Sequence, residues 1–212
     1  MPRRDSACLL KARRQGPTTL RILDGVYPPG EDTYLILDCI TRERAKLGFV
    51  LADIGTGSGI LALELARTAG LVLATDLNPA AARCAHCNAE LNQLSWKIDV
   101  VCSNGLEPIR TSKRLSGIVS NPPYLQEEMS VHQRIEDRAW AGGERGTETL
   151  LRFLRQAVQH LESAGSVWMV LSSSSGIDEP LREMERLGCR TQIIGETTLF
   201  FERLVVVRAI KT

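Results

Sequence analysis

A glycine-rich turn between two buried strands constrains the fold of this 212-residue chain more than any other feature. The apolar runs Phe49 to Ile54 and Leu71 to Thr75 predict strands, and Gly59 to Thr68 between them has helical spacing. The segment Asp53 to Gly59 joins the first strand to the helix. Its three glycines let the backbone turn sharply and approach a ligand closely. Strand, turn, helix and strand form a βαβ unit, whose two strands are parallel.

The elements that follow extend this unit into a larger sheet. Asn78 and Pro79 open a second helix, because asparagine caps helices well and proline suits the first helical position. Further helices are predicted over Gly146 to Glu162 and Glu179 to Leu187, and further strands over Trp96 to Cys102, Gly117 to Ser120, Ser166 to Leu171, Thr191 to Ile194 and Leu204 to Ala209. The last two strands have no room for a helix between them, so they should pair antiparallel. We therefore predict an α/β fold with a mostly parallel sheet that is covered on both faces and ends in a hairpin.

Composition favours a single domain and argues against several classes of protein. Hydrophobic residues make up 43% of the chain, which is enough for one sizeable core. The net charge of +1 argues against stable binding to a nucleic-acid backbone. The sequence shows no secretory signal and no apolar run near the roughly 20 residues that span a bilayer. We expect a cytoplasmic protein with no membrane partner.

The pair Cys84 and Cys87, with His86 between them, is the only close cluster of metal-binding residue types. A structural zinc ion needs about four ligands, and no second Cys/His cluster supplies the rest. The two cysteines also fall on one predicted helix, where they would share a face. We predict reduced thiols here and no metal site.

The glycine turn favours S-adenosylmethionine over a dinucleotide. A dinucleotide fingerprint needs a third glycine at the position that Ile60 occupies. Asp53 would repel a pyrophosphate, whereas a cofactor with an ammonium and a sulfonium would be attracted to that carboxylate. Asp76, at the end of the second strand, lies where such folds bind ribose hydroxyls, and a carboxylate accepts both hydroxyl protons. The other interpretation of Asp76 is a cap for the following helix.

The segment Asn121-Pro122-Pro123-Tyr124 follows a strand, at the edge of the sheet where ligands bind in open α/β folds. An amide nitrogen is a poor nucleophile because its lone pair is delocalised. The Asn121 side-chain oxygen and the Pro122 carbonyl could accept its two protons, and Tyr124 could stack on the flat group. The polar stretch Gln126 to Arg145 would then be a substrate-facing loop. The sequence predicts methyl transfer to a planar NH2 group.

These motifs resemble the HemK group of class I methyltransferases, which modify the glutamine of the Gly-Gly-Gln loop in peptide-release factors. The resemblance runs from about Val26 to the end, through Val26 to Thr33, Asp53 to Gly59, Asp76 to Pro79, Asn121 to Tyr124 and Ala139 to Gly143. The first and last pieces are similar to the short branch of eukaryotes and archaea. The family implies a Rossmann-like domain with a seven-stranded sheet over residues 26–212. Residues 1–25 would be an N-terminal extension, partly disordered.

The resemblance also implies the site residues and the partners. The cofactor-binding candidates are Thr33, Asp53, Gly55, Gly57, Asp76, Asn104 and Asn121. The catalytic candidates are Asn121, Pro122 and Tyr124, and Pro123 joins them in the substrate-binding set. Asn104 stands where the family usually has an aspartate that contacts adenine. Members of this branch commonly need a small zinc-binding activator subunit, and the exposed edge strand Trp96 to Cys102 could pair with it.

Three alternatives stay open at this point. Methylation of an adenine or guanine amino group in nucleic acid uses the same chemistry, although base flipping usually needs more positive charge. Methylation of a lysine side chain is a second alternative, but its nitrogen is not delocalised. The third is a non-catalytic relative that kept the fold.

Overall fold

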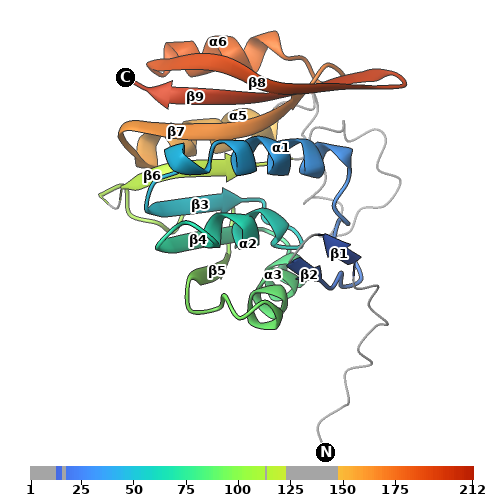
Figure 1. Ribbon diagram of the computed structural model, residues 1–212. Helices are drawn as coiled ribbons and strands as arrows, with labels where there is room; N and C mark the ends of the chain where they lie inside the picture. Colours follow the sequence, from blue (N-terminus) through green and yellow to red (C-terminus); the bar gives the residue numbers. More distant parts are fainter. Residues whose placement is uncertain (1–12, 16–17, 113, 123–147) are drawn as a thin grey trace, which may run out of the picture.

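The computed structural model describes residues 13–15, 18–112, 114–122 and 148–212. Its main sheet has seven strands in the order β5-β4-β3-β6-β7-β9-β8 (Figure 1). They are β3 (Val50–Ile54), β4 (Leu71–Asp76), β5 (Ile98–Cys102), β6 (Leu115–Ser120), β7 (Leu161–Ser172), β8 (Cys189–Leu199) and β9 (Glu202–Lys211). Strands β3 to β7 pair in parallel, while β9 pairs antiparallel with β7 and β8. The predicted fold class and the C-terminal hairpin are confirmed.

Helices cover both faces of this sheet. They are α1 (Glu31–Arg42), α2 (Ile60–Ala66), α3 (Pro79–Leu91), α5 (Glu148–His160) and α6 (Asp178–Arg186), with a short 3-10 turn η1 (Arg44–Lys46) after α1. Successive strand residues point to opposite faces, so Leu51 joins the core under α1 and α2, and Ala52 joins the core under α5. The two cores explain why the central strands are apolar on both faces.

The start of α3 follows from its sequence. The Asn78 side chain accepts a hydrogen bond of 2.9 Å from the backbone N–H of Ala80, and Pro79 takes the first helical position. The predicted helix start is confirmed. Strands β7, β8 and β9 extend beyond their predicted limits, because their ends carry polar residues that the hydrophobic pattern does not mark.

Helix α1, the 3-10 turn η1 and a small N-terminal hairpin were not predicted. Helix α1 follows Pro28-Pro29-Gly30 and buries Ile36, Cys39 and Ile40 against the sheet. A small hairpin of β1 (Arg13–Gln15) and β2 (Thr18–Leu20) lies in the N-terminal extension. Its second strand packs on α3, where Leu20 is buried.

Part of the predicted site lies outside the described residues. This applies to Pro123, Tyr124, the loop Gln126 to Arg145 and the motif Ala139 to Gly143. Within the part of the chain that the structure describes, none of the helices has the length and apolar character needed to cross a membrane.

Candidate functional site

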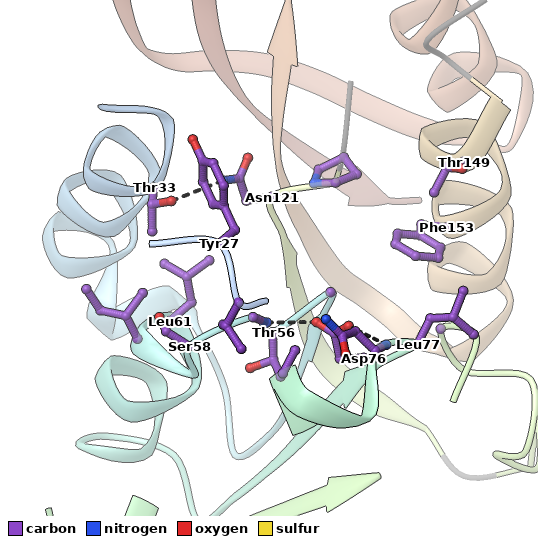
Figure 2. A pocket seen from close by; sticks show the side chains of 18 of the residues that line it. Tyr27, Thr33, Thr56, Ser58, Leu61, Asp76, Leu77, Asn121, Thr149 and Phe153 are labelled. Atoms are coloured by element: carbon purple, nitrogen blue, oxygen red, sulfur yellow. Dashed lines mark hydrogen bonds between the residues drawn. The ribbon is translucent and has the colours of Figure 1, made fainter. Parts of the chain in front are cut away.

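A cavity of about 310 Å³ opens at the carboxyl ends of β3, β4 and β6, between the starts of α1 and α5 (Figure 2). Its walls come from the glycine turn, the ends of β4 and β6, and the segment before α1. Of the predicted residues, Thr33, Gly55, Gly57, Asp76, Asn104, Asn121 and Pro122 line it. The fold therefore brings together residues that are far apart in the chain, such as Asp32 and Asn121, which are 89 positions apart.

The glycine turn is held in its shape by backbone conformation and by packing. Gly59 has a φ of +81°, and a Cβ there would lie 2.9 Å from the Ala85 Cα atom of α3. No other residue fits this position without separating α2 from α3. The N–H groups of Gly55 and Thr56 donate to the Thr75 carbonyl at 2.8 Å and 2.9 Å, which ties the turn to the end of β4.

Asp53 is fully buried behind this turn and is not among the residues that line the cavity. Its Oδ2 accepts hydrogen bonds from the Thr56 hydroxyl at 2.6 Å and from the Ala62 N–H at 3.0 Å. Its Oδ1 is buried without a partner among the described residues. Burial raises the pKa of Asp53 to about 7, and the nearby charge of Asp76 adds to this effect. Asp53 therefore supports the turn from below.

Asp76, at the end of β4, faces the cavity (Figure 2). Its two carboxylate oxygens accept backbone hydrogen bonds from Gly57 at 2.8 Å and from Asn78 at 2.9 Å. Burial raises the pKa of Asp76, while these backbone N–H groups oppose that shift. Asn78, and not Asp76, caps α3, so the helix-cap interpretation of Asp76 is wrong. A carboxylate has about four acceptor positions, so Asp76 keeps the capacity to accept from a ligand.

Asn104 lies on the cavity wall after β5. Its Nδ2 donates to Glu107 Oε1 at 2.6 Å, and its Oδ1 is buried without a partner in the described part of the chain. Gly105 follows with a φ of +60°, and a Cβ there would collide with the Gln156 side chain of α5. The positive φ disfavours a larger residue after Asn104.

The Asn121 side chain has a fixed orientation at the end of β6. Its Nδ2 donates to Asp32 Oδ2 at 3.0 Å and to Thr33 Oγ1 at 3.2 Å, both on α1 (Figure 2). Since a carboxylate only accepts hydrogen bonds, the NH2 group must face Asp32. The Asn121 Oδ1 is consequently left as a buried acceptor with no partner in the described chain.

Several cavity residues were not identified as site residues from the sequence. Tyr27 and Phe153 face the cavity from opposite sides, Tyr27 before α1 and Phe153 on α5 (Figure 2). Burial raises the pKa of the Tyr27 phenol, and the carboxylates of Asp32 and Glu202 raise it further. Tyr27 could have been found from the sequence, because it lies in the Val26 to Thr33 piece that resembles the HemK group. Phe153 gave no such signal, because a phenylalanine on an amphipathic helix looks like an ordinary core residue.

Comparison with known proteins shows the family to which this chain belongs. The family model described as "Methyltransferase small domain" matches residues 25–198. The chain belongs to the methyltransferase small domain family. The matched span of this methyltransferase contains every predicted site residue and the whole of the glycine turn.

Named relatives narrow the family. This methyltransferase is 34% identical over 172 residues to Methyltransferase HEMK2 of Mus musculus, covering 77% of this chain and 79% of that protein. It is 33% identical over 167 residues to the release factor glutamine methyltransferase of Synechocystis sp., covering 71% of this chain and 55% of that protein. The resemblance to the HemK group is confirmed.

A solved structure shares the fold of this methyltransferase. It is the E. cuniculi Mtq2-Trm112 complex, described as responsible for methylation of the eRF1 translation termination factor. The TM-score is 0.67 at 23% identity, and the match covers 89% of this chain and 99% of that one. The Rossmann-like methyltransferase fold is thereby confirmed.

Proposed function

We propose that this protein transfers a methyl group from S-adenosylmethionine to the side-chain amide of the glutamine in the Gly-Gly-Gln loop of a class I peptide-release factor. The observation that carries the proposal is the Asn121 carboxamide, whose NH2 is anchored and whose Oδ1 is buried without a partner in the described chain. The relatives named for HEMK2 and for release-factor glutamine methylation, and the fold neighbour named for eRF1 methylation, support the substrate.

The cavity fits the cofactor. The Asn104 Oδ1 is a buried acceptor that needs a donor, and the amino group of adenine is one. Asp76 would accept from the ribose hydroxyls, and Thr33 and the turn residues Gly55 and Gly57 would hold the amino-acid end. Apolar side chains such as Leu77 and Phe153 complete the walls. Bound S-adenosylmethionine supplies an electrophilic methyl group on its sulfonium.

The chain's own groups would activate the acceptor nitrogen. The Asn121 Oδ1 would accept a hydrogen bond from one N–H of the glutamine NH2, and the Pro122 carbonyl would accept one from the other N–H. These two hydrogen bonds would localise the nitrogen lone pair, and the proton that the nitrogen loses on methylation would pass to water. Pro122 has no N–H of its own to compete for the substrate. Holding the acceptor nitrogen in line with the methyl carbon and the sulfur is worth about 7–11 kcal/mol in favourable cases. Tyr124 and Pro123, which the structure does not describe, would stack on the amide and stiffen the segment.

A zinc-binding activator of the Trm112 type would pair with β5, which stands at one end of the sheet order. The fold neighbour is a complex with Trm112. Trp96, just before β5, is 75% exposed, and an unpaired strand edge beside an exposed tryptophan favours strand addition. Release factors act during translation, so the cytoplasm is where we expect this protein to meet its substrate.

The decisive experiment compares acceptors and variants. Purified protein with its activator and isotopically labelled cofactor is incubated with a release factor or with nucleic acid, and the products are identified by mass spectrometry. We expect label on the glutamine alone. Asn121→Ala should abolish transfer while calorimetry still detects cofactor binding, and Asp76→Ala should weaken cofactor binding. Label confined to nucleic acid, or full turnover by Asn121→Ala, would contradict the proposal.

A further inference from the structure

The tip of the β8–β9 hairpin carries two aromatic side chains in full contact with water. Leu199 pairs with Glu202, so Phe200 and Phe201 are the two residues of the turn. They are 98% and 97% exposed, more than any other large apolar side chain in the described residues. Their ring centroids lie 6.0 Å apart, with the rings tilted by 47°. Such exposure costs hydration free energy and is typical of a binding surface.

The turn itself does not require phenylalanine. Two-residue hairpin turns favour glycine, asparagine or aspartate, because the preferred turn types need a positive φ. Neither Phe200 nor Phe201 has a positive φ. The turn is therefore not of these types, and it tolerates phenylalanine without requiring it, so turn chemistry does not account for the two rings.

The residues next to the turn hold the hairpin to the end of β7. The N–H of Ser173 donates to the Arg203 carbonyl at 2.9 Å, and the N–H of Arg203 donates to the Ser173 hydroxyl at 2.8 Å. Glu202 Oε1 accepts from the hydroxyls of Ser174, at 2.9 Å, and of Ser172. The two rings are thus presented on a braced support, which lowers the entropy lost on binding.

The strand register places this tip beyond the carboxyl ends of the parallel strands, where the cavity also lies. Ser120 pairs with Met169, and Asn121 follows it toward the carboxyl end of the parallel strands. Ser172, three residues further along β7, pairs with Leu204. The turn therefore extends past these carboxyl ends, and the hairpin projects beyond the body of the sheet (Figure 1). Glu202, next to the turn, lies close enough to the cavity residue Tyr27 for its charge to raise the pKa of Tyr27.

We propose that Phe200 and Phe201 dock the methyl-acceptor protein, by inserting into an apolar depression on the acceptor surface beside its glutamine-bearing loop. This inference rests on the proposed function. The turn and the cavity share one edge, so one folded acceptor can contact both at once. Two exposed aromatic residues are the type of side chain that dominates binding energy in protein interfaces.

Other occupants fit the surroundings less well. The activator strand β5 is at the opposite end of the sheet order from β8, so a partner on β5 is placed away from the turn. A membrane surface would favour basic residues next to the rings, whereas Glu202 is adjacent and the nearby Arg203 is paired with Glu196 at 2.6 Å. A second copy bound at the tip would obstruct the approach to the cavity.

The test separates docking from chemistry by using two acceptors. The double substitution Phe200→Ser with Phe201→Ser is compared with the wild type on an intact release factor and on a short peptide that contains Gly-Gly-Gln. We expect the KM for the intact protein to rise about tenfold or more, and the kinetics on the peptide to stay unchanged. Phe49→Ser is the control, because Phe49 is 70% exposed but precedes β3 at the opposite edge of the sheet.

The outcomes distinguish this inference from the function on which it rests. If the wild type methylates both acceptors and the double variant matches it on the intact protein, docking by the hairpin is wrong. Equal losses on protein and peptide would also overturn it, because the turn would then act on the cavity itself. A dimer that dissociates in the double variant, with unchanged KM, would assign the tip to a second copy. If the wild type methylates neither acceptor, the proposed function fails and the inference fails with it.

Discussion

At the scale of single residues, the proposed reaction depends on the orientation of one amide, that of Asn121. The Asn121 amide has a fixed orientation because Asp32 and Thr33 accept hydrogen bonds from its nitrogen. Asp32 is buried and accepts a further hydrogen bond of 2.6 Å from the N–H of Thr33 at the start of α1. Asp32 was not identified from the sequence as a site residue, because its partner is 89 positions away.

Replacing Asp32 should reduce the rate and spare the fold. In Asp32→Ala the Asn121 amide loses the charged one of its two acceptors and can rotate more freely, so we expect kcat to fall about thirtyfold. Asp32→Asn keeps an acceptor oxygen and should stay within about threefold of the wild type. Steady-state kinetics on the release factor measures both, with Asp38→Ala on the exposed side of α1 as the control. A wild-type kcat for Asp32→Ala would show that the amide holds its orientation without this carboxylate.

Asp53 should make stability depend on pH. Its pKa is raised from 3.8 to about 7 in the folded protein, so the folded state keeps a proton that the unfolded chain releases. The free energy of unfolding should therefore fall as pH rises between about 4 and about 7, by about 1.4 kcal/mol for each unit of pKa shift. Asp53→Asn cannot titrate.

Urea denaturation of the wild type and of Asp53→Asn, at several pH values from about 5 to about 8, measures this effect. We expect the wild type to lose stability relative to the variant as pH rises, with the difference levelling off above about pH 8. A difference that does not change with pH would mean that Asp53 is ionised throughout, and that its surroundings are better solvated than its burial indicates.

At the scale of elements, β2 and the glycine turn are joined to α3 through one buried side chain. The Asn88 amide donates to the carbonyls of Arg21 at 2.7 Å and Ser58 at 2.8 Å, and accepts from the Arg21 N–H at 2.8 Å. Asn92 repeats the contact one turn later, with the N–H and the carbonyl of Thr19. Strand β2 is therefore part of the same folded unit as α3 and the glycine turn.

Asn88→Ala should destabilise the protein by about 3 kcal/mol, because it leaves buried backbone groups without partners. The melting temperature and the urea midpoint measure this loss. Glu90→Ala is the matched control, because Glu90 is exposed on the same helix. A loss no larger than that of the control would mean that water replaces the asparagine at this position.

The elements that could be predicted are those whose local sequence agrees with the fold. Asn78-Pro79 specifies the start of α3, and the apolar runs specify β3 and β4. Helix α1 is different, since Thr33, Ile36 and Ile40 are β-branched residues of modest helix propensity. Its stability comes from packing on the sheet, which a local pattern does not reveal.

At the scale of the whole molecule, the two ends of the sheet differ in accessibility. Strand β8 is an edge with a register shift between Ile193 and Gly195, and it carries charged residues that discourage pairing with another chain. Strand β5 is short and regular, and Trp96 precedes it. Only β5 therefore has the features expected of an edge that accepts a partner strand.

Trp96→Ala should weaken binding to a Trm112-type subunit about tenfold or more, because a large aromatic side chain would lose its place in the interface. Calorimetry with the purified subunit measures the affinity. Ile193→Ala, on the opposite edge, should leave it unchanged. If both substitutions weaken the binding equally, or if neither weakens it, the assignment of the activator to β5 is contradicted.

The sequence predicts where the site lies in the fold better than it predicts which side chains line the cavity. Asp76, Asn104 and Asn121 follow strands that end at one edge, so their convergence was expected, and the structure brings them to one cavity. The burial of Asp53 behind the turn was not expected, because it depends on how the turn and α2 pack around this side chain. The contribution of Phe153 from α5 depends on long-range packing in the same way.

The Asn88 contact has a further consequence. The amide proton of Arg21 is donated to a side chain that also holds the carbonyl of Ser58 in the glycine turn. Its exchange with deuterated solvent requires the opening of that contact. Filling the cavity would hinder the opening, so the rate of isotope exchange at the Arg21 amide reports occupancy of the cavity, with no label attached to the protein.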